Sequence, residues 1–164
     1  KKVIYVANVK EEDLFKDNHY VERIKEFAKT ENSPVIKISA KLEQEIAELP
    51  EEEVEEYLQT LGIEKSGLDK LIASAFQMLD LITFFTTGEM ETKAWTIKKN
   101  TAAEEAAAKI HTDIKKGFIK AEIVSYDDFI HYGGRGKAKE EGKIRFEGRD
   151  AVIRDGDVIL FHHH

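Results

Sequence analysis

The chain has 164 residues, a length that allows one large or two small domains. It contains no cysteine, which excludes disulfides and thiolate chemistry and is typical of the reducing cytoplasm. No apolar run approaches the ~20 residues that a membrane span needs, so we expect no membrane partner. Residues 1–80 carry 11 Lys and Arg against 18 Asp and Glu, whereas residues 81–161 carry 14 basic and 14 acidic residues. Because the acidic first part repels phosphates, any contact with nucleic acid is expected in the second part.

The first part begins with a predicted strand–helix–strand unit. Val3–Ala7 and Val35–Ile38 are short, continuous apolar runs, which are typical of buried strands in a parallel sheet. The intervening apolar spacing predicts a helix with one buried stripe, made of Tyr20, Ile24, Phe27 and Ala28. Units of this kind bind ligands at the carboxyl ends of their strands.

Three further helices are predicted after this unit. Helical spacing runs from Leu42 to Leu49, stops at Pro50 and resumes from Val54 to Leu61. Ser66 and Asp69 resemble a capping box at the start of the last helix. Its apolar residues are expected to face a core: Leu68, Leu71, Ile72, Ala75, Phe76 and Leu79.

Residues 81–161 are expected to form a second domain, a small half-buried sheet wrapped on a helix. From Glu91 to Lys98 the side chains alternate, with Trp95 and Ile97 on the buried side. A second strand is expected to have one buried and one wet face, with Ile119, Ala121 and Ile123 opposite Lys120, Glu122 and Val124.

An alanine-rich helix is predicted between these strands. It starts with Thr101 as N-cap and Glu104 at N3, and it ends at Ile110. Lys143–Glu147 and Val158–Phe161 are expected to complete the sheet.

Two polar features in this part are given structural rather than catalytic roles. His111 has no spaced His or Cys partner for a metal, so we expect it to interact with the last carbonyls of the alanine-rich helix. Tyr126–Phe129 is expected to begin another helix, with Phe129 and Ile130 in the core.

Several stretches of the second part are similar to the C-terminal TGS domain of the YchF family, the Obg-like P-loop ATPases. They are Ala94–Ile97, His111–Glu122, Ser125–Asp128 and Arg154–Val158. The resemblance covers nearly all of residues 81–161 and implies an α+β fold of the β-grasp, or ubiquitin-like, type. It also implies that residues 1–80 are the C-terminal part of a P-loop nucleotide-binding domain, an α/β remnant of a parallel sheet. Residues 162–164 resemble the start of an affinity tag and are left out of functional reasoning.

Two motifs at the predicted strand ends resemble the base-binding segments of this family. Asn8-Val9-Lys10-Glu11 is similar to the family's Asn-x-x-Glu version of the GTPase motif Asn-Lys-x-Asp. Ser39-Ala40-Lys41 is similar to the Ser-Ala-Lys motif, which places a backbone N–H beside the base. The resemblance therefore implies that the base of ATP or GTP, bound with Mg²⁺ in the intact protein, contacts Asn8, Val9, Glu11, Ser39, Ala40 and Lys41.

The fourth residue of the first motif, Glu11, affects the expected preference between adenine and guanine. An aspartate at this position pairs the two oxygens of its carboxylate with two neighbouring donors on guanine. The side chain of Glu11 is one methylene longer, which moves these oxygens away from the donors. Adenine lacks the donor pair, so we expect relaxed or adenine-leaning specificity. Considered without the resemblance, Asn8 is more simply interpreted as an N-cap or Asx-turn residue.

The loop that binds phosphate is missing from the sequence. No Gly-x-x-x-x-Gly-Lys-[Ser/Thr] occurs, and the nearest candidate, Gly136–Lys143, has one residue too many between its glycines. Ile144 also stands where a hydroxyl must hold Mg²⁺. We therefore expect this chain to be a portion of a longer NTP hydrolase, inactive and unable to bind nucleotide tightly by itself.

Basic residues of the second part are candidates for contact with RNA, the ribosome or a protein. The candidates are Lys98, Lys99, Lys115, Lys116, Lys120, Arg135 and Lys137, and the last two belong to a group near Tyr132 that includes Lys139, Lys143 and Arg145. Lysines beside aromatic rings can follow an RNA backbone, although interleaved acidic residues make a mixed, solvated surface an equally good interpretation. The resemblance implies association with the ribosome. The alternatives are a non-catalytic ubiquitin-like module that binds RNA or a protein, or a domain that regulates access to the nucleotide.

Overall fold

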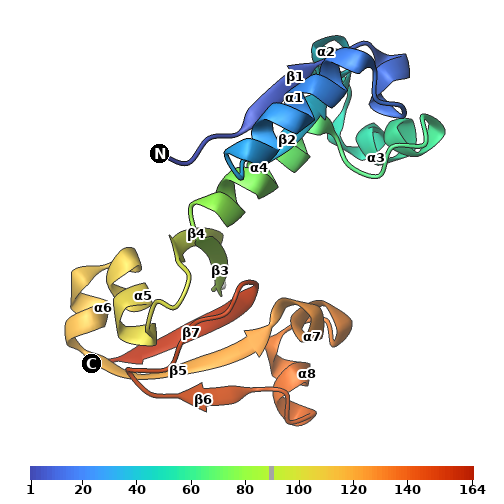
Figure 1. The fold of residues 1–164 in the computed structure, drawn as a ribbon. Coiled ribbons are helices and arrows are strands. Elements are labelled where there is room, and N and C mark those ends of the chain that lie inside the picture. The colour runs from blue at the N-terminus through green and yellow to red at the C-terminus, as the bar shows by residue number, and fades with distance from the viewer. Residues whose placement is uncertain (89–90) are drawn as a thin grey trace. The chain divides into compact units, whose positions relative to one another are not determined.

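The computed structural model describes residues 1–88 and 91–164, which form two compact units, residues 1–78 and 79–164 (Figure 1). Each unit contains both helices and strands, so the expected mixed α/β character is confirmed. None of the helices in the described part of the chain combines the length and the apolar composition that a membrane span requires.

The first unit is built on a two-stranded parallel sheet. β1 (Tyr5–Asn8) pairs with β2 (Val35–Ile38), and Asn8 lies opposite Ile38 at the carboxyl ends. The 3₁₀ helix η1 (Glu11–Leu14) and α1 (His19–Thr30) connect the strands. The predicted strand–helix–strand order is confirmed, although β1 begins at Tyr5 and not at Val3.

α1 buries a narrower stripe than predicted. Asn18 caps it by accepting hydrogen bonds from the backbone N–H groups of Tyr20 and Val21. Val21 and Ala28 are 1% exposed, whereas Tyr20 is 64% exposed and Phe27 is 55% exposed. The prediction that the last two are buried is wrong, because two strands can cover only a narrow strip of a helix.

Three helices follow β2: α2 (Ala40–Ala47), α3 (Glu51–Thr60) and α4 (Gly67–Met78). Leu42 of α2 and Leu58 of α3 are buried. No residue of α4, all of which the structure describes, is fully buried. Leu68, Ile72 and Leu79 are about half exposed, so the prediction that they face a core is wrong.

The start of α4 is held tightly against the sheet. Ser66 Oγ accepts a hydrogen bond from the Asp69 N–H at 3.0 Å, which confirms the predicted helix start. A Cβ atom on Gly67 would lie 2.7 Å from a methyl carbon of Ile38 and 2.8 Å from the Glu43 carboxylate. Only glycine fits between α4 and β2 at this approach.

The second unit contains a five-stranded sheet in the order β4-β3-β7-β5-β6. β3 and β7 are parallel, and the other neighbouring pairs are antiparallel. The elements are, in chain order, β3 (Leu81–Thr87), β4 (Thr92–Lys98), α5 (Ala103–Ile110), α6 (Thr112–Lys116), β5 (Phe118–Ser125), α7 (Tyr126–His131), α8 (Arg135–Glu140), β6 (Arg145–Glu147) and β7 (Asp157–His163). The predicted strands are present as β4, β5, β6 and β7, whereas β3 is an additional strand that was not predicted.

Both faces of the middle of the sheet are covered. Ile123 of β5 packs in the main core with three alanines of α5 and with Phe84 of β3. Val124, the next residue of β5, therefore points to the opposite face, where it packs with Ala138 of α8. Trp95 packs against the main core, as expected.

The predicted wet face of β5 is wrong. Glu122 is only 5% exposed and Val124 is fully buried, because α7 and α8 cover that side. Ile119, predicted to be on the buried face, is 48% exposed. The strand register shifts between Phe118 and Lys120, and this bulge turns the Ile119 side chain outward.

Local predictions at Thr101, His111 and Ile130 are corrected in whole or in part. α5 begins after Ala102, which forms no side-chain cap, and the Thr101 hydroxyl donates to the Lys98 carbonyl instead. His111 is the C-cap of α5, and its backbone N–H donates to the Ala107 carbonyl at 3.2 Å, so the expected contact with the last carbonyls is made by the backbone. Its side chain instead accepts a hydrogen bond from the Asp113 N–H through Nδ1 and so begins α6. Ile130 is 58% exposed, because α7 turns only one side to the sheet.

Candidate functional site

The two predicted base-binding motifs lie side by side in the first unit. The parallel pairing of β1 and β2 extends one step beyond the strands, where the Val9 N–H donates to the Ile38 carbonyl at 2.8 Å. The side-chain oxygen of Asn8 then accepts a hydrogen bond from the Ala40 N–H at 3.0 Å. Residues separated by 32 positions are thus joined directly at the carboxyl edge of the sheet.

Ser39, the residue before Ala40, is buried beside the hydrogen bond between Asn8 and Ala40. Its side chain is 2% exposed, and its hydroxyl oxygen accepts a hydrogen bond from the Leu42 N–H at 3.4 Å as the N-cap of α2. Ser39 therefore shapes the start of α2, whereas the neighbouring Asn8 and Ala40 are exposed.

The bond to Ala40 determines which way the Asn8 amide faces. With its oxygen accepting from the Ala40 N–H, the amide nitrogen of Asn8 presents its two N–H groups on the other side. Asn8 thus joins the two motifs and also has donors that face outward. It is not an N-cap, since Lys10 holds that position before η1.

Glu11 and Lys41 form an ion pair across the site. Lys41 Nζ lies 3.0 Å from Glu11 Oε1 and 3.4 Å from Glu45 Oε1. The hydrogen bond to Glu11 is the main reason that the pKa of Lys41 lies above its ordinary value. The carboxylate expected to face a base is therefore already neutralised by a cation from the second motif.

A tyrosine of α3 extends this chain of polar contacts. The Tyr57 hydroxyl donates to Glu45 Oε2 at 2.8 Å. This bond, reinforced by Lys41, holds the pKa of Glu45 below its usual range, and it raises the pKa of Tyr57. Glu45 and Tyr57 were not among the predicted site residues. They lie 12 positions apart on two different helices, and nothing in the sequence signals a contact between them.

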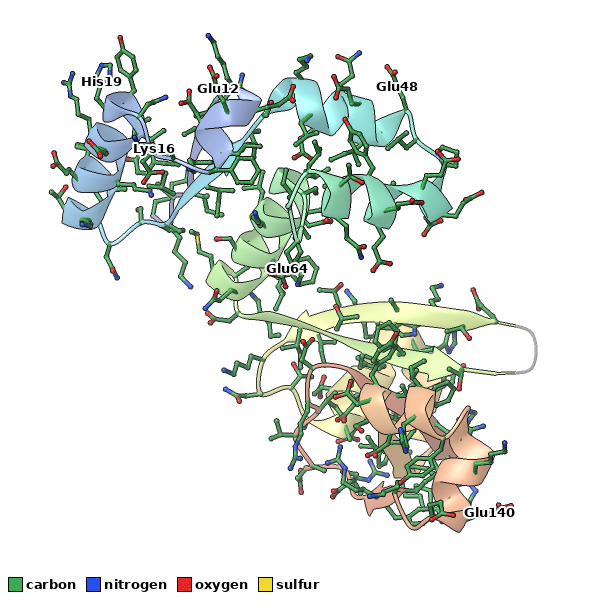
Figure 2. All side chains as sticks on the ribbon, turned by 90° about the vertical axis from the view of Figure 1, so that its right-hand side faces the viewer. Glu12, Lys16, His19, Glu48, Glu64 and Glu140 are labelled. Atoms are coloured by element: carbon green, nitrogen blue, oxygen red, sulfur yellow. The ribbon has the colours of Figure 1, made fainter. Side chains whose placement is uncertain are left out.

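The joined motifs line an open pocket of about 730 Å³. Its lining consists of residues 8–12 and 39–41, and it includes every residue predicted to contact the base. Figure 2 labels Glu12, which lies in η1 at this pocket. Amide, carboxylate and ammonium groups beside the partly buried Val9 can bind a small planar molecule that has both hydrogen-bonding edges and an apolar face.

Nothing described here is suited to hold a phosphate-bound metal. In residues 1–88 and 91–164, no three His, Cys, Asp or Glu side chains are grouped as metal ligands. The described residues that line the pocket therefore do not form such a group of metal ligands.

The predicted basic residues of the second unit fall into two classes. Some are already engaged: Lys115 pairs with Glu105, Lys116 lies 3.8 Å from Asp113, Arg135 lies 3.9 Å from Glu122, and Lys98 donates to the Leu79 carbonyl at 2.8 Å. Hydrogen bonding to Glu105 also raises the pKa of Lys115. In contrast, Lys99, Lys120 and Lys137 have no ion pair within the described part of the chain.

Comparison with known proteins identifies the family. Residues 81–164 match the family model YchF-GTPase_C, described as a protein of unknown function (DUF933). The chain belongs to the YchF family. Its relatives within the YchF family include proteins named ribosome-binding ATPase YchF from Bacillus subtilis (49% identical over 163 residues) and Pasteurella multocida (48% over 161 residues), and each alignment covers 98% of this chain.

A solved YchF structure also matches the chain. The YchF GTPase of Schizosaccharomyces pombe is similar with a TM-score of 0.84 and 35% sequence identity, over 99% of this chain and 43% of that one. The chain spans 44% of the length of the two bacterial relatives. It corresponds to the C-terminal part of a YchF protein.

Proposed function

We propose that residues 1–78 are the C-terminal part of a P-loop nucleotide-binding domain and contact the base of ATP or GTP. The observation that carries this proposal is the hydrogen bond between Asn8 and Ala40, which joins two base-recognition motifs at neighbouring strand ends. In the intact protein this domain binds and hydrolyses the nucleotide with Mg²⁺, whereas the present chain lacks the phosphate loop and is inactive. The printed names of the relatives include both an ATPase and a GTPase, which supports nucleotide hydrolysis without deciding the base.

Each motif residue has a defined role in this proposal. The outward amide N–H groups of Asn8 donate to the N7 acceptor that adenine and guanine share. Val9 supplies an apolar contact to the ring face. Because Lys41 already neutralises Glu11, the two donors of guanine would have to compete with an ammonium group for the carboxylate. The pocket therefore selects purines and favours adenine.

The substitution Asn8→Asp tests this role. An aspartate oxygen can still accept from the Ala40 N–H, so the internal tie remains, but the outward donor is lost. In a chain extended to the length of its relatives, we expect about tenfold weaker ATP binding, on the scale of one hydrogen bond. Isothermal titration with ATP and GTP, beside a thermal melt, measures both effects.

Two results would count against the base site. Unchanged ATP affinity in the Asn8→Asp variant would remove Asn8 from the site. Tight binding that is exclusive to GTP would contradict the role given to Glu11 and Lys41.

We further propose that residues 79–164 are a TGS domain with a β-grasp fold that docks on the ribosome in the cytoplasm. The strand order supports the fold, since the first hairpin, β3–β4, is followed by a helix and the last strand lies parallel beside β3. The names of the bacterial relatives support the ribosome as partner. Ribosomal RNA would contact the basic surface of the unit, above all those lysines that have no internal ion pair.

Sedimentation with purified ribosomes tests the docking proposal. We expect the chain to pellet with ribosomes at low salt and to be released as salt rises, because counterions return to the phosphates. No pelleting at low salt would contradict the proposal. Pelleting that is insensitive to salt would favour the alternative of a protein-binding, ubiquitin-like module.

A further inference from the structure

An exposed aromatic ring with two lysines forms a distinct patch on the second unit. Phe146 lies in the edge strand β6 and is 53% exposed. Lys120 of β5 places Nζ 4.7 Å from the centre of this ring, and Lys139 of α8 places Nζ 6.0 Å from it. We call Phe146, Lys120 and Lys139 the Phe146 patch. Neither the fold nor the base pocket accounts for an apolar ring at this position.

The patch keeps a surplus of positive charge. In the described part of the chain, neither of its ammonium groups has a carboxylate within ion-pair distance, and each lies over the ring of Phe146 instead. Two carboxylates on the same strands are already occupied, since Glu122 pairs with Arg135 at 3.9 Å and Glu147 pairs with Arg145 at 3.8 Å. Glu140, labelled in Figure 2, ends α8 next to Lys139 and is the acidic neighbour of the patch in sequence.

A second ring–lysine pair lies in the same segment of the chain. Lys143 Nζ is 6.0 Å from the ring of Tyr132, which is the C-cap of α7. Lys143 also lacks an ion-pair partner within the residues that the structure describes. The segment from Tyr132 to Phe146 thus has two aromatic rings, exposed at Phe146 and partly buried at Tyr132, each near an ammonium group without an ion pair in the described residues.

We infer that the Phe146 patch binds single-stranded RNA, with one base stacked on Phe146 and the adjoining phosphates on Lys120 and Lys139. This inference rests on the proposed ribosome docking and specifies its chemistry. Every base has a flat face that can stack on an aromatic ring, and lysines beside the ring follow the backbone. A paired duplex keeps its base faces stacked inside and cannot use the ring in this way.

A protein partner fits the patch less well. An acidic peptide would pair with the two lysines but would have no use for the flat face of Phe146. A peptide could also add as a strand beside β6, but β6 has only three residues and offers few backbone groups. RNA uses the ring and both charges together.

The first experiment measures binding of the chain to a short, fluorescently labelled oligouridine by anisotropy. We expect Phe146→Leu to weaken binding by about fivefold or more, since stacking is lost while an apolar side chain remains. Phe146→Tyr keeps the ring and should restore the affinity of the unaltered chain. Ile130→Ala removes another exposed apolar side chain of this unit and serves as the control, with no change expected.

A matched pair of lysine variants tests the position of the charge. Lys137 and Lys139 both lie on α8 and have equal charge, but they differ by two positions and therefore point about 200° apart. We expect Lys139→Ala to lower both the affinity and its salt dependence more than Lys137→Ala. Equal effects of the two variants, or a Phe146→Leu variant that behaves like Ile130→Ala, would overturn the inference.

Two further measurements separate this site from the general proposal. A duplex of the same length should compete poorly with the labelled strand, and equal competition would overturn base stacking. If the Phe146→Leu and Lys139→Ala variants still pellet with ribosomes as the unaltered chain does, docking stands but this patch is wrong. If the unaltered chain binds the oligouridine through Phe146 yet never pellets with ribosomes, the stacking site stands and the proposed docking fails.

Discussion

Single residues of the first unit hold the pocket together by polar contacts that run through two helices. Glu11 pairs with Lys41, Lys41 with Glu45, and Glu45 accepts from the Tyr57 hydroxyl. Each group is partly or largely open to solvent, so each contact by itself contributes little stability. Their main effect is on position, because the chain of contacts keeps the Lys41 ammonium group beside the Glu11 carboxylate at the proposed base site.

Removal of the Tyr57 hydroxyl should change the acid dependence of the first unit. The pKa of Glu45 is depressed in the folded state, so the stabilisation by Tyr57 is present above the ordinary glutamate pKa and is lost as pH falls through the folded pKa. We expect Tyr57→Phe to raise the pKa of Glu45. The difference in unfolding free energy between the two chains should be largest at neutral pH and should vanish in acid.

Nuclear magnetic resonance titration measures the pKa of the Glu45 carboxyl, and urea unfolding at neutral and at acidic pH measures the difference in unfolding free energy. Tyr20→Phe is the control, because the Tyr20 side chain is largely exposed and its hydroxyl has no hydrogen-bond partner among the described residues. A Glu45 titration that does not respond to Tyr57→Phe would show that the hydroxyl is not its partner in solution.

At the scale of elements, two glycines in helices have opposite significance. Gly67 begins α4 where the backbone touches β2 and where its N–H donates to Glu43 Oε1 at 2.7 Å. Gly136 lies inside α8, and apart from its chain neighbours and the backbone of this helix no atom lies within 4 Å of the position of an added Cβ. Close approach requires the first glycine, whereas the second only adds conformational entropy to the unfolded chain.

Alanine at these two positions should therefore have opposite effects on stability. We expect Gly67→Ala to destabilise the first unit by about 1–3 kcal/mol, since the new methyl overlaps Ile38. Gly136→Ala should stabilise the second unit by about 0.5–1 kcal/mol through helix propensity. Circular dichroism follows the first change, and fluorescence of Trp95, the single tryptophan, follows the second. Stabilisation by Gly67→Ala would contradict the close approach of α4 and β2.

At the scale of the whole chain, the two units carry different parts of the proposed function. The first unit has the pocket that we propose to bind the base, and the sequence contains no loop for phosphate. The chain also spans only 44% of its bacterial relatives. Contact with the base alone, without a loop that binds the phosphates, should give little affinity for a nucleotide, because its charged part has no partner.

We expect this chain to show no ATP hydrolysis above buffer in the presence of Mg²⁺. A protein extended to the length of its relatives should hydrolyse ATP under the same conditions, and release of inorganic phosphate measures both. Hydrolysis by residues 1–164 alone would contradict the proposed division of labour between this chain and the rest of the protein.

Much of the fold was predictable from local sequence patterns. The apolar run Val35–Ile38 forms β2 with the predicted bounds, and the alternation around Trp95 and Ile97 gives the correct buried side of β4. Local hydrogen bonding also determines helix starts such as Ser66. The sequence also singled out the two motifs of the proposed base site, because each directly follows an apolar strand, and the structure places them side by side. The resemblance to the YchF family, read from short stretches of residues 81–161, is confirmed.

Tertiary structure alone decided which faces are covered and which charges are paired. Glu122 is buried because α8 packs on β5, and Tyr20 is exposed because only two strands underlie α1. Glu11 lies 30 positions from its partner Lys41, and two helices separate the strand of Lys120 from that of Phe146. Glu45 and Tyr57 belong to two different helices. A periodic pattern specifies the direction of a side chain relative to its own backbone, whereas its neighbours depend on packing between elements.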